Sequence, residues 1–102
     1  MLPTILQSNK SAIISLCQRC KVIRLDAFGS VLRADFRPDS DIDFLVRFHR
    51  DEHTNAFIQY FEFKEGLEAI LNRRVDLVCE TAIRNSYFKR EVEATRETLY
   101  AA

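Results

Sequence analysis

The chain has 102 residues, 47% hydrophobic and 29% charged, an ordinary composition for one soluble globular domain with little room for a second. Lys plus Arg number 15 and Asp plus Glu number 15, so the formal net charge is zero, which argues against direct nucleic-acid binding over a broad basic surface. No segment approaches the roughly 20 apolar residues of a membrane span, and the N-terminal segment does not resemble a signal peptide. We therefore expect one domain over residues 1–102, in the cytoplasm and without membrane contact.

Hydrophobic periodicity predicts an alternation of helices and strands. Helices are expected over residues 3–20, 54–71 and, more weakly, 81–93, with a short helical turn at 30–34. Strands are expected over residues 22–28, 41–48, 74–79 and 98–101. In the first strand, alternation places Ile23, Leu25 and Ala27 on one face and Arg24 and Asp26 on the other. This order implies a mixed α/β (α+β) fold, a small sheet flanked by helices.

The cysteines are expected to be reduced thiols. Cys17 and Cys20 form a CxxC pair, and His49 and His53 are spaced like the histidines of a zinc finger. However, the gap from Cys20 to His49 is much longer than the ~12 to 15 residues that such a finger tolerates. Cys17 and Cys20 also continue the apolar face of the first helix, which favours buried thiols over structural zinc.

A glycine at the end of the first predicted strand begins the most informative motif, G-S-x(10)-D-x-D. Gly29 has no Cβ atom, so the backbone can approach a ligand closely. If Ser30 begins a helical turn, its amide and hydroxyl point at a position where free amides and the helix dipole favour an anion such as phosphate. The alternative is an ordinary turn glycine.

Two carboxylates, Asp41 and Asp43, complete this motif. Strand geometry places both on one face with Cα atoms roughly 6.5 to 7 Å apart, where like charges repel. A magnesium ion would relieve this conflict, because Mg²⁺ prefers carboxylates and substrate phosphates. Alternatively, Asp41 caps the preceding turn and Asp43 faces solvent.

Asp76 is the third predicted carboxylate, on the polar side of the strand over residues 74–79. If this strand lies beside the one carrying Asp41 and Asp43, three carboxylates can hold two Mg²⁺ ions about 3.5 to 4 Å apart. Such a site could activate an acceptor hydroxyl towards the α-phosphorus of a nucleoside triphosphate and neutralise the leaving pyrophosphate. Gly29 and Ser30 would then bind the β and γ phosphates. Arg33 could add a charge-assisted contact, unless it is simply solvated.

These motifs resemble those of the DNA polymerase β-like nucleotidyltransferase superfamily, and in particular of the minimal nucleotidyltransferase (MNT) antitoxins that pair with HEPN-family ribonuclease toxins. The matching segments are FGSVLRADFRPDSDIDFLV, RRVDLV and IRNSYFKREVEATRETLY, and the likeness covers nearly the whole chain. Gly29, Ser30, Asp41, Asp43 and Asp76 match the family pattern, whereas Ala34 stands where many relatives carry glycine. The resemblance implies a Mg²⁺- and ATP-dependent enzyme that transfers AMP to a hydroxyl, here a tyrosine of a cognate HEPN toxin.

Two other functions stay open. One is a non-catalytic antitoxin that binds and masks the toxin, against which the intact acidic triad argues. The other is a small-molecule (aminoglycoside-type) nucleotidyltransferase, against which the shortness of the chain argues. The apolar residues over 57–63 spread wider than one core-facing stripe, so this part of the predicted helix is either a partner interface or buried on two sides.

Overall fold

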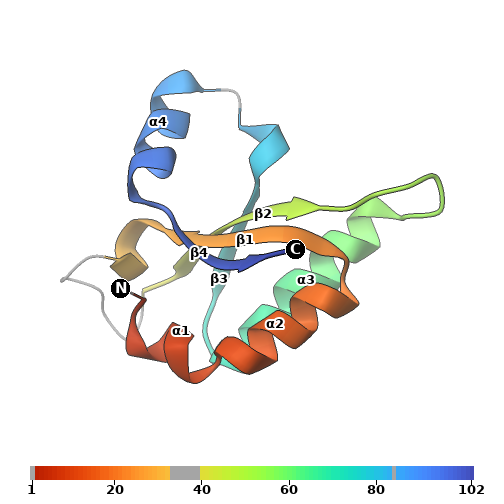
Figure 1. The fold of residues 1–102 in the computed structure, drawn as a ribbon, viewed down its shortest axis with the longest axis horizontal. Helices are drawn as coiled ribbons and strands as arrows, with labels where there is room; N and C mark the ends of the chain where they lie inside the picture. Colours follow the sequence, from red (N-terminus) through yellow and green to blue (C-terminus); the bar gives the residue numbers. More distant parts are fainter. Residues whose placement is uncertain (1, 33–39, 84) are drawn as a thin grey trace.

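A four-stranded sheet in the order β3-β2-β1-β4 forms the centre of the structure (Figure 1). The computed structural model describes residues 2–32, 40–83 and 85–102. β1 is antiparallel to both β2 and β4, whereas β2 and β3 are parallel. The predicted mixed α/β class is confirmed. The strands are β1 (Val22–Phe28), β2 (Ile42–Phe48), β3 (Val75–Cys79) and β4 (Glu97–Ala101).

Helices cover the sheet on both faces, α1, α2 and α3 on one and α4 on the other (Figure 1). The helices are α1 (Thr4–Ser8), α2 (Lys10–Arg19), α3 (Ala56–Leu71) and α4 (Ser86–Thr95), with short 3₁₀ turns η1 (Gly29–Leu32) and η2 (Glu80–Ala82). The first predicted helix is divided at Asn9, whose Nδ2 donates to the Ile5 carbonyl at 2.8 Å. The weakly predicted helix over 81–93 is instead η2 followed by α4. In the segments described here, no helix is both long enough and apolar enough to cross a membrane.

The main core lies between the sheet and helices α1, α2 and α3. Phe44 of β2 and Phe63 of α3 are completely buried there. The predicted alternation in β1 is wrong at its start, because a β-bulge between Val22 and Arg24 shifts the register. Val22 therefore packs into the core, and Ile23 is 36% exposed.

The cysteine thiols differ in burial. Cys17 is buried in the main core, and Cys20 and Cys79 are half-buried; all three are free thiols. Burial raises the pKa of Cys17 to about 12, and the nearby Cys20 adds to this effect. The predicted burial is therefore confirmed for Cys17, whereas Cys20 is only half-buried.

Part of the apolar surface of α3 is exposed to solvent. Phe57 is 72% exposed, Ile58 52% and Phe61 39%, so burial on two sides is wrong for these residues. The rings of Phe57 and Phe61 contact each other at a centroid distance of 4.7 Å. That this surface binds a partner stays a prediction.

Candidate active site

Asp43 and Asp76 lie directly opposite each other on β2 and β3. Because adjacent strands are about 4.8 Å apart, this register brings the two residues side by side on the same sheet face. Asp43 is half-buried and Asp76 is exposed. The prediction that the later strand places Asp76 beside the D-x-D motif is thus confirmed for Asp43. Asp41 is exposed and lies one residue before β2 begins, rather than within the strand.

Gly29 approaches this pair from the end of β1. Its φ of +74° is in the left-handed region, and a Cβ atom at this position would lie 2.5 Å from Oδ2 of Asp43. The preceding residue, Phe28, pairs with Asp43 across β1 and β2. The glycine turn predicted to bind phosphate therefore lies against the Asp43 carboxylate.

The other predicted phosphate ligands lie partly or wholly outside the described part of the chain. Ser30 lies in η1, which agrees with the short helical turn predicted after Gly29, but the position of its side chain is not described. Arg33, Ala34 and most of the predicted turn over residues 35–40 lie outside the described residues; Ser40 is a bend directly before Asp41.

The donor chemistry of this site suits a hard divalent cation. Within the part of the chain that the structure describes, no group of three or more His, Cys, Asp or Glu side chains is arranged to hold a metal ion. Asp41 is thus not gathered with Asp43 and Asp76 into one ligand set. Two adjacent carboxylates are nevertheless compatible with the coordination preference of Mg²⁺, which usually binds one or two protein carboxylates and completes its shell with substrate phosphates and water.

A cleft of about 540 Å³ opens beside Gly29 and Asp43, on the α4 face of the sheet. Its volume is within the range of roughly 300 to 1,000 Å³ that is usual for small-molecule sites. The rings of Phe28 and Phe88 meet edge to face with centroids 6.0 Å apart. The described lining residues are Phe28, Gly29, Asp43, Phe88, Glu91, Val92, Ala94 and Thr95.

Helix α4 supplies most of the lining of this cleft, and the sequence reasoning did not include it in the site. A signal was available, because Phe88 and Val92 are four residues apart in an otherwise polar helix and so share one face. Val92 packs with Phe28 and Leu45 in a second, smaller core cluster. This cluster lies on the same sheet face as Asp43 and Asp76.

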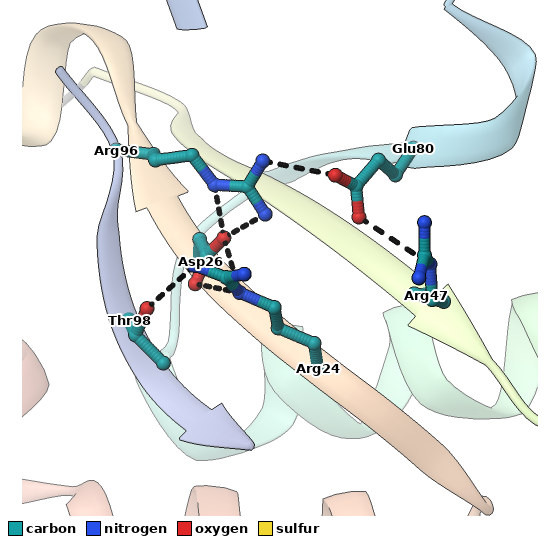
Figure 2. A network of polar contacts seen from close by, with 6 residues as sticks. All are labelled: Arg24, Asp26, Arg47, Glu80, Arg96 and Thr98. Atoms are coloured by element: carbon teal, nitrogen blue, oxygen red, sulfur yellow. Dashed lines mark hydrogen bonds and ion pairs between the residues drawn. The ribbon is translucent and has the colours of Figure 1, made fainter. Parts of the chain in front are cut away.

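A buried ion-pair network lies next to that cluster (Figure 2). Asp26 is fully buried, and its carboxylate accepts hydrogen bonds from Arg24 at 3.2 Å and from Arg96. Arg96 also donates from Nη1 to Oε1 of Glu80 at 2.9 Å, and Arg47 pairs with the same carboxylate. The hydrogen bond from Arg96 is the main cause that lowers the pKa of Glu80, with the charges of Arg96, Arg47 and Arg24 adding to it.

A glycine turn packed against Asp43, with Asp76 on the adjacent strand and a cleft of small-molecule size beside them, fits a nucleotide-handling transferase. Residues 10–99 match the nucleotidyltransferase domain family, and the chain belongs to that family. This confirms the resemblance inferred from the sequence motifs.

Individual relatives agree with this assignment. The protein adenylyltransferase MntA of Thermococcus cleftensis is 35% identical over 85 residues, which cover 83% of this chain and 80% of that relative. A solved structure described as a minimal nucleotidyltransferase superposes with a TM-score of 0.76 and 33% identity, covering 95% of each chain. A toxin–antitoxin crystal structure with AMP-PNP superposes with a TM-score of 0.70 and 25% identity, covering 92% of this chain and 74% of the matched chain.

Proposed function

We propose that this nucleotidyltransferase is a Mg²⁺-dependent protein adenylyltransferase that moves AMP from ATP to a tyrosine hydroxyl of a HEPN-family ribonuclease toxin, and so acts as its antitoxin. The observation that carries the proposal is that Gly29 and Asp43 meet in the lining of one cleft, with Asp76 directly opposite Asp43 on the next strand. The similarity to a protein adenylyltransferase, MntA, and to a toxin–antitoxin chain crystallised with AMP-PNP supports a protein acceptor and an adenine nucleotide.

In this proposal the carboxylates of Asp43 and Asp76 would hold magnesium, Asp41 would join them when the ion binds, and two ions are the expected number. Magnesium bound there would supply positive charge that polarises the triphosphate and lowers the pKa of the acceptor hydroxyl. Gly29 and Ser30 offer backbone amides to the β and γ phosphates, and Arg33 is a further candidate contact. The acceptor oxygen forms a bond to the α-phosphorus, the bond to pyrophosphate breaks, and the hydroxyl proton leaves to solvent.

The nucleoside is proposed to occupy the cleft under α4. Phe28, Phe88 and Val92 give that cleft an apolar wall, which suits a planar base. Because the nucleotide would occupy this cleft, we expect the acceptor hydroxyl to arrive on a partner protein. The cytoplasm, where ATP and Mg²⁺ are both available, is the compartment we expect for this reaction.

The test is AMP transfer by the double variant Asp41→Asn, Asp43→Asn, using the chain co-purified with a HEPN partner from a neighbouring reading frame. The wild type should label the partner from radiolabelled ATP and Mg²⁺, with added AMP visible by intact mass. The double variant should fold and lose the label. Asp51→Asn, which removes a charge from the exposed turn between β2 and α3, is the matched control and should keep it.

The outcomes separate the three candidate functions. Label that persists in the double variant contradicts the assignment of these carboxylates. An unlabelled partner that is still neutralised by wild type and double variant alike favours a non-catalytic antitoxin. Transfer to an aminoglycoside, but not to the partner, favours a small-molecule enzyme.

Binding of Mg²⁺-ATP gives a second measurement that does not need the partner. Ligand at 100 times its Kd stabilises a protein by about 2.7 kcal/mol. For a domain of this size that corresponds to a rise in Tm of roughly 10 °C or more. The rise should vanish when EDTA removes the metal and in the double variant.

A further inference from the structure

Helix α4 forms one side of the cleft but is attached to the sheet by few buried side chains. Val92 is its single buried residue, whereas Tyr87 is 69% exposed and Phe88 37% exposed. Figure 1 shows α4 standing apart from helices α1, α2 and α3, on the far side of the sheet. A helix with so little buried apolar surface has low local stability unless another interaction fixes it.

Arg96 supplies such an interaction at the C-terminal end of α4. It follows Thr95, a residue of the cleft lining, and its backbone N–H donates to the Val92 carbonyl at 2.8 Å. A cation at this end of a helix also interacts favourably with the helix dipole. The Arg96 side chain is 10% exposed and points to Asp26 and Glu80, which are 0% and 17% exposed (Figure 2).

The two partners of Arg96 lie on, or directly after, two strands next to the candidate active site. Asp26 lies on β1, two residues before Phe28, which lines the cleft. Glu80 directly follows β3, the strand of Asp76. One guanidinium therefore ties α4 to both strands, and its planar fork allows little freedom of orientation. If Arg96 were lost, the buried Asp26 carboxylate would keep its ion pair with Arg24. That pair is weaker, because the Arg24 side chain is 44% exposed and water screens its charge.

From this geometry we infer that Arg96 is a positioning residue that fixes α4 as the wall of the nucleotide cleft. The inference rests on the proposed function. Arg96 does not line the cleft, so it acts through Thr95, Val92 and Phe88. Its loss should therefore weaken nucleotide binding and leave the transfer step, at Asp43 and Asp76, largely unchanged.

The variants Arg96→Met, Arg96→Lys and Arg47→Met test this inference. Arg96→Met keeps an unbranched apolar stem but removes the charge, and should raise the KM for ATP about tenfold or more, with kcat within about threefold of wild type. Arg96→Lys keeps the charge without the fork and should restore part of the affinity. Arg47→Met is the control and should behave as wild type, because the Arg47 side chain is 52% exposed at the edge of the same network.

Hydrogen exchange gives a readout that is independent of activity. In Arg96→Met, amides of residues 86–95 should exchange about tenfold faster, while those of β1 and β2 stay unchanged. If this variant does not fold, Glu80→Gln replaces it. That variant keeps the contact between Arg96 and Asp26, and it should show the same selective changes to a smaller extent.

Two results would overturn the role of Arg96: an unchanged KM for ATP, or exchange that accelerates equally in every segment. The second result would mean that Arg96 contributes only global stability. A wild type that transfers no AMP and binds no Mg²⁺-ATP would instead refute the proposed function. The exchange comparison would then still decide whether Arg96 fixes α4.

Discussion

Gly29 lies against the carboxylate of Asp43 so closely that a Cβ atom at position 29 would come within 2.5 Å of Oδ2. Ten residues separate the Gly29-Ser30 turn after β1 from the D-x-D motif at the start of β2, yet Gly29 and Asp43 are in direct proximity in the fold. Two separate sequence signals therefore describe a single site, and changes at Gly29 should act on Asp43.

Gly29→Ala should reduce AMP transfer far more than it reduces stability. The left-handed φ costs an alanine about 1 to 2 kcal/mol, and the new methyl group must displace the Asp43 carboxylate. A displacement of about 1 Å can lower a rate about 100-fold. Transfer assays and urea unfolding of the same preparation check the two expectations.

Gly66→Ala is the matched control for that variant. Gly66 lies in α3, where a Cβ atom would meet the side chain of Leu16 at 2.8 Å, remote from Asp43. This change should disturb the packing of α2 against α3 and leave the transfer rate per folded molecule unchanged. Equal losses of activity in the two glycine variants would contradict the special role of Gly29.

Asp76→Asn should abolish transfer without destabilising the metal-free protein. Asp43 and Asp76 are direct neighbours on parallel strands, and like charges in that position repel by roughly 0.2 to 1 kcal/mol. The variant should therefore be as stable as wild type, or slightly more stable, when both are unfolded in urea with EDTA. With Mg²⁺-ATP present the order should reverse, because the wild type alone gains from binding. A variant that is clearly less stable in EDTA would argue for a structural role of Asp76.

The pH dependence of stability should include a contribution from Glu80. In the folded protein the pKa of Glu80 lies below the ordinary glutamate value of 4.5, chiefly because of the hydrogen bond from Arg96. A carboxyl with a lower pKa in the folded state stabilises the fold above its unfolded pKa and loses this effect as the pH falls through the folded value. Unfolding free energies between about pH 7 and pH 3 should thus show wild type above Glu80→Gln at neutral pH and a gap that closes in acid.

A constant gap across that range would mean that ionisation of Glu80 is not linked to folding. Glu65→Gln, which removes a carboxylate from an exposed position on α3, controls for the change in net charge.

Truncation of two phenylalanines of α3 should change the stability of the protein by very different amounts. Phe63 is fully buried and meets the ring of Phe48 edge to face at 5.7 Å, so Phe63→Ala should cost about 3 to 5 kcal/mol. Phe57 is 72% exposed, so Phe57→Ala should change stability by no more than about 0.5 kcal/mol. Chemical denaturation of both variants measures the difference. A large loss for Phe57→Ala would show that this ring is covered in solution.

Sequence periodicity predicted β1 with its observed bounds and the other strands to within a residue. It also identified the inward face of β2, because strand alternation is a local property that requires no knowledge of neighbours. It misplaced the first residues of β1, since a bulge depends on how the partner strand pairs. It likewise treated Asp26 as an ordinary polar residue, because its burial follows from Arg96, which lies 70 residues further along the chain.

The sequence by itself identified the candidate residues for the chemistry: a glycine able to adopt positive φ, and carboxylates at a spacing that predicts one shared face. The tertiary structure decided how they meet. Parallel pairing of β2 with β3 brings Asp76 to Asp43, and an ion pair between distant segments holds α4 over the cleft. The two differ because the interactions involved act over different distances along the chain. Backbone preferences depend on a few neighbouring residues, whereas strand order and buried charge pairing depend on assembly of the whole sheet.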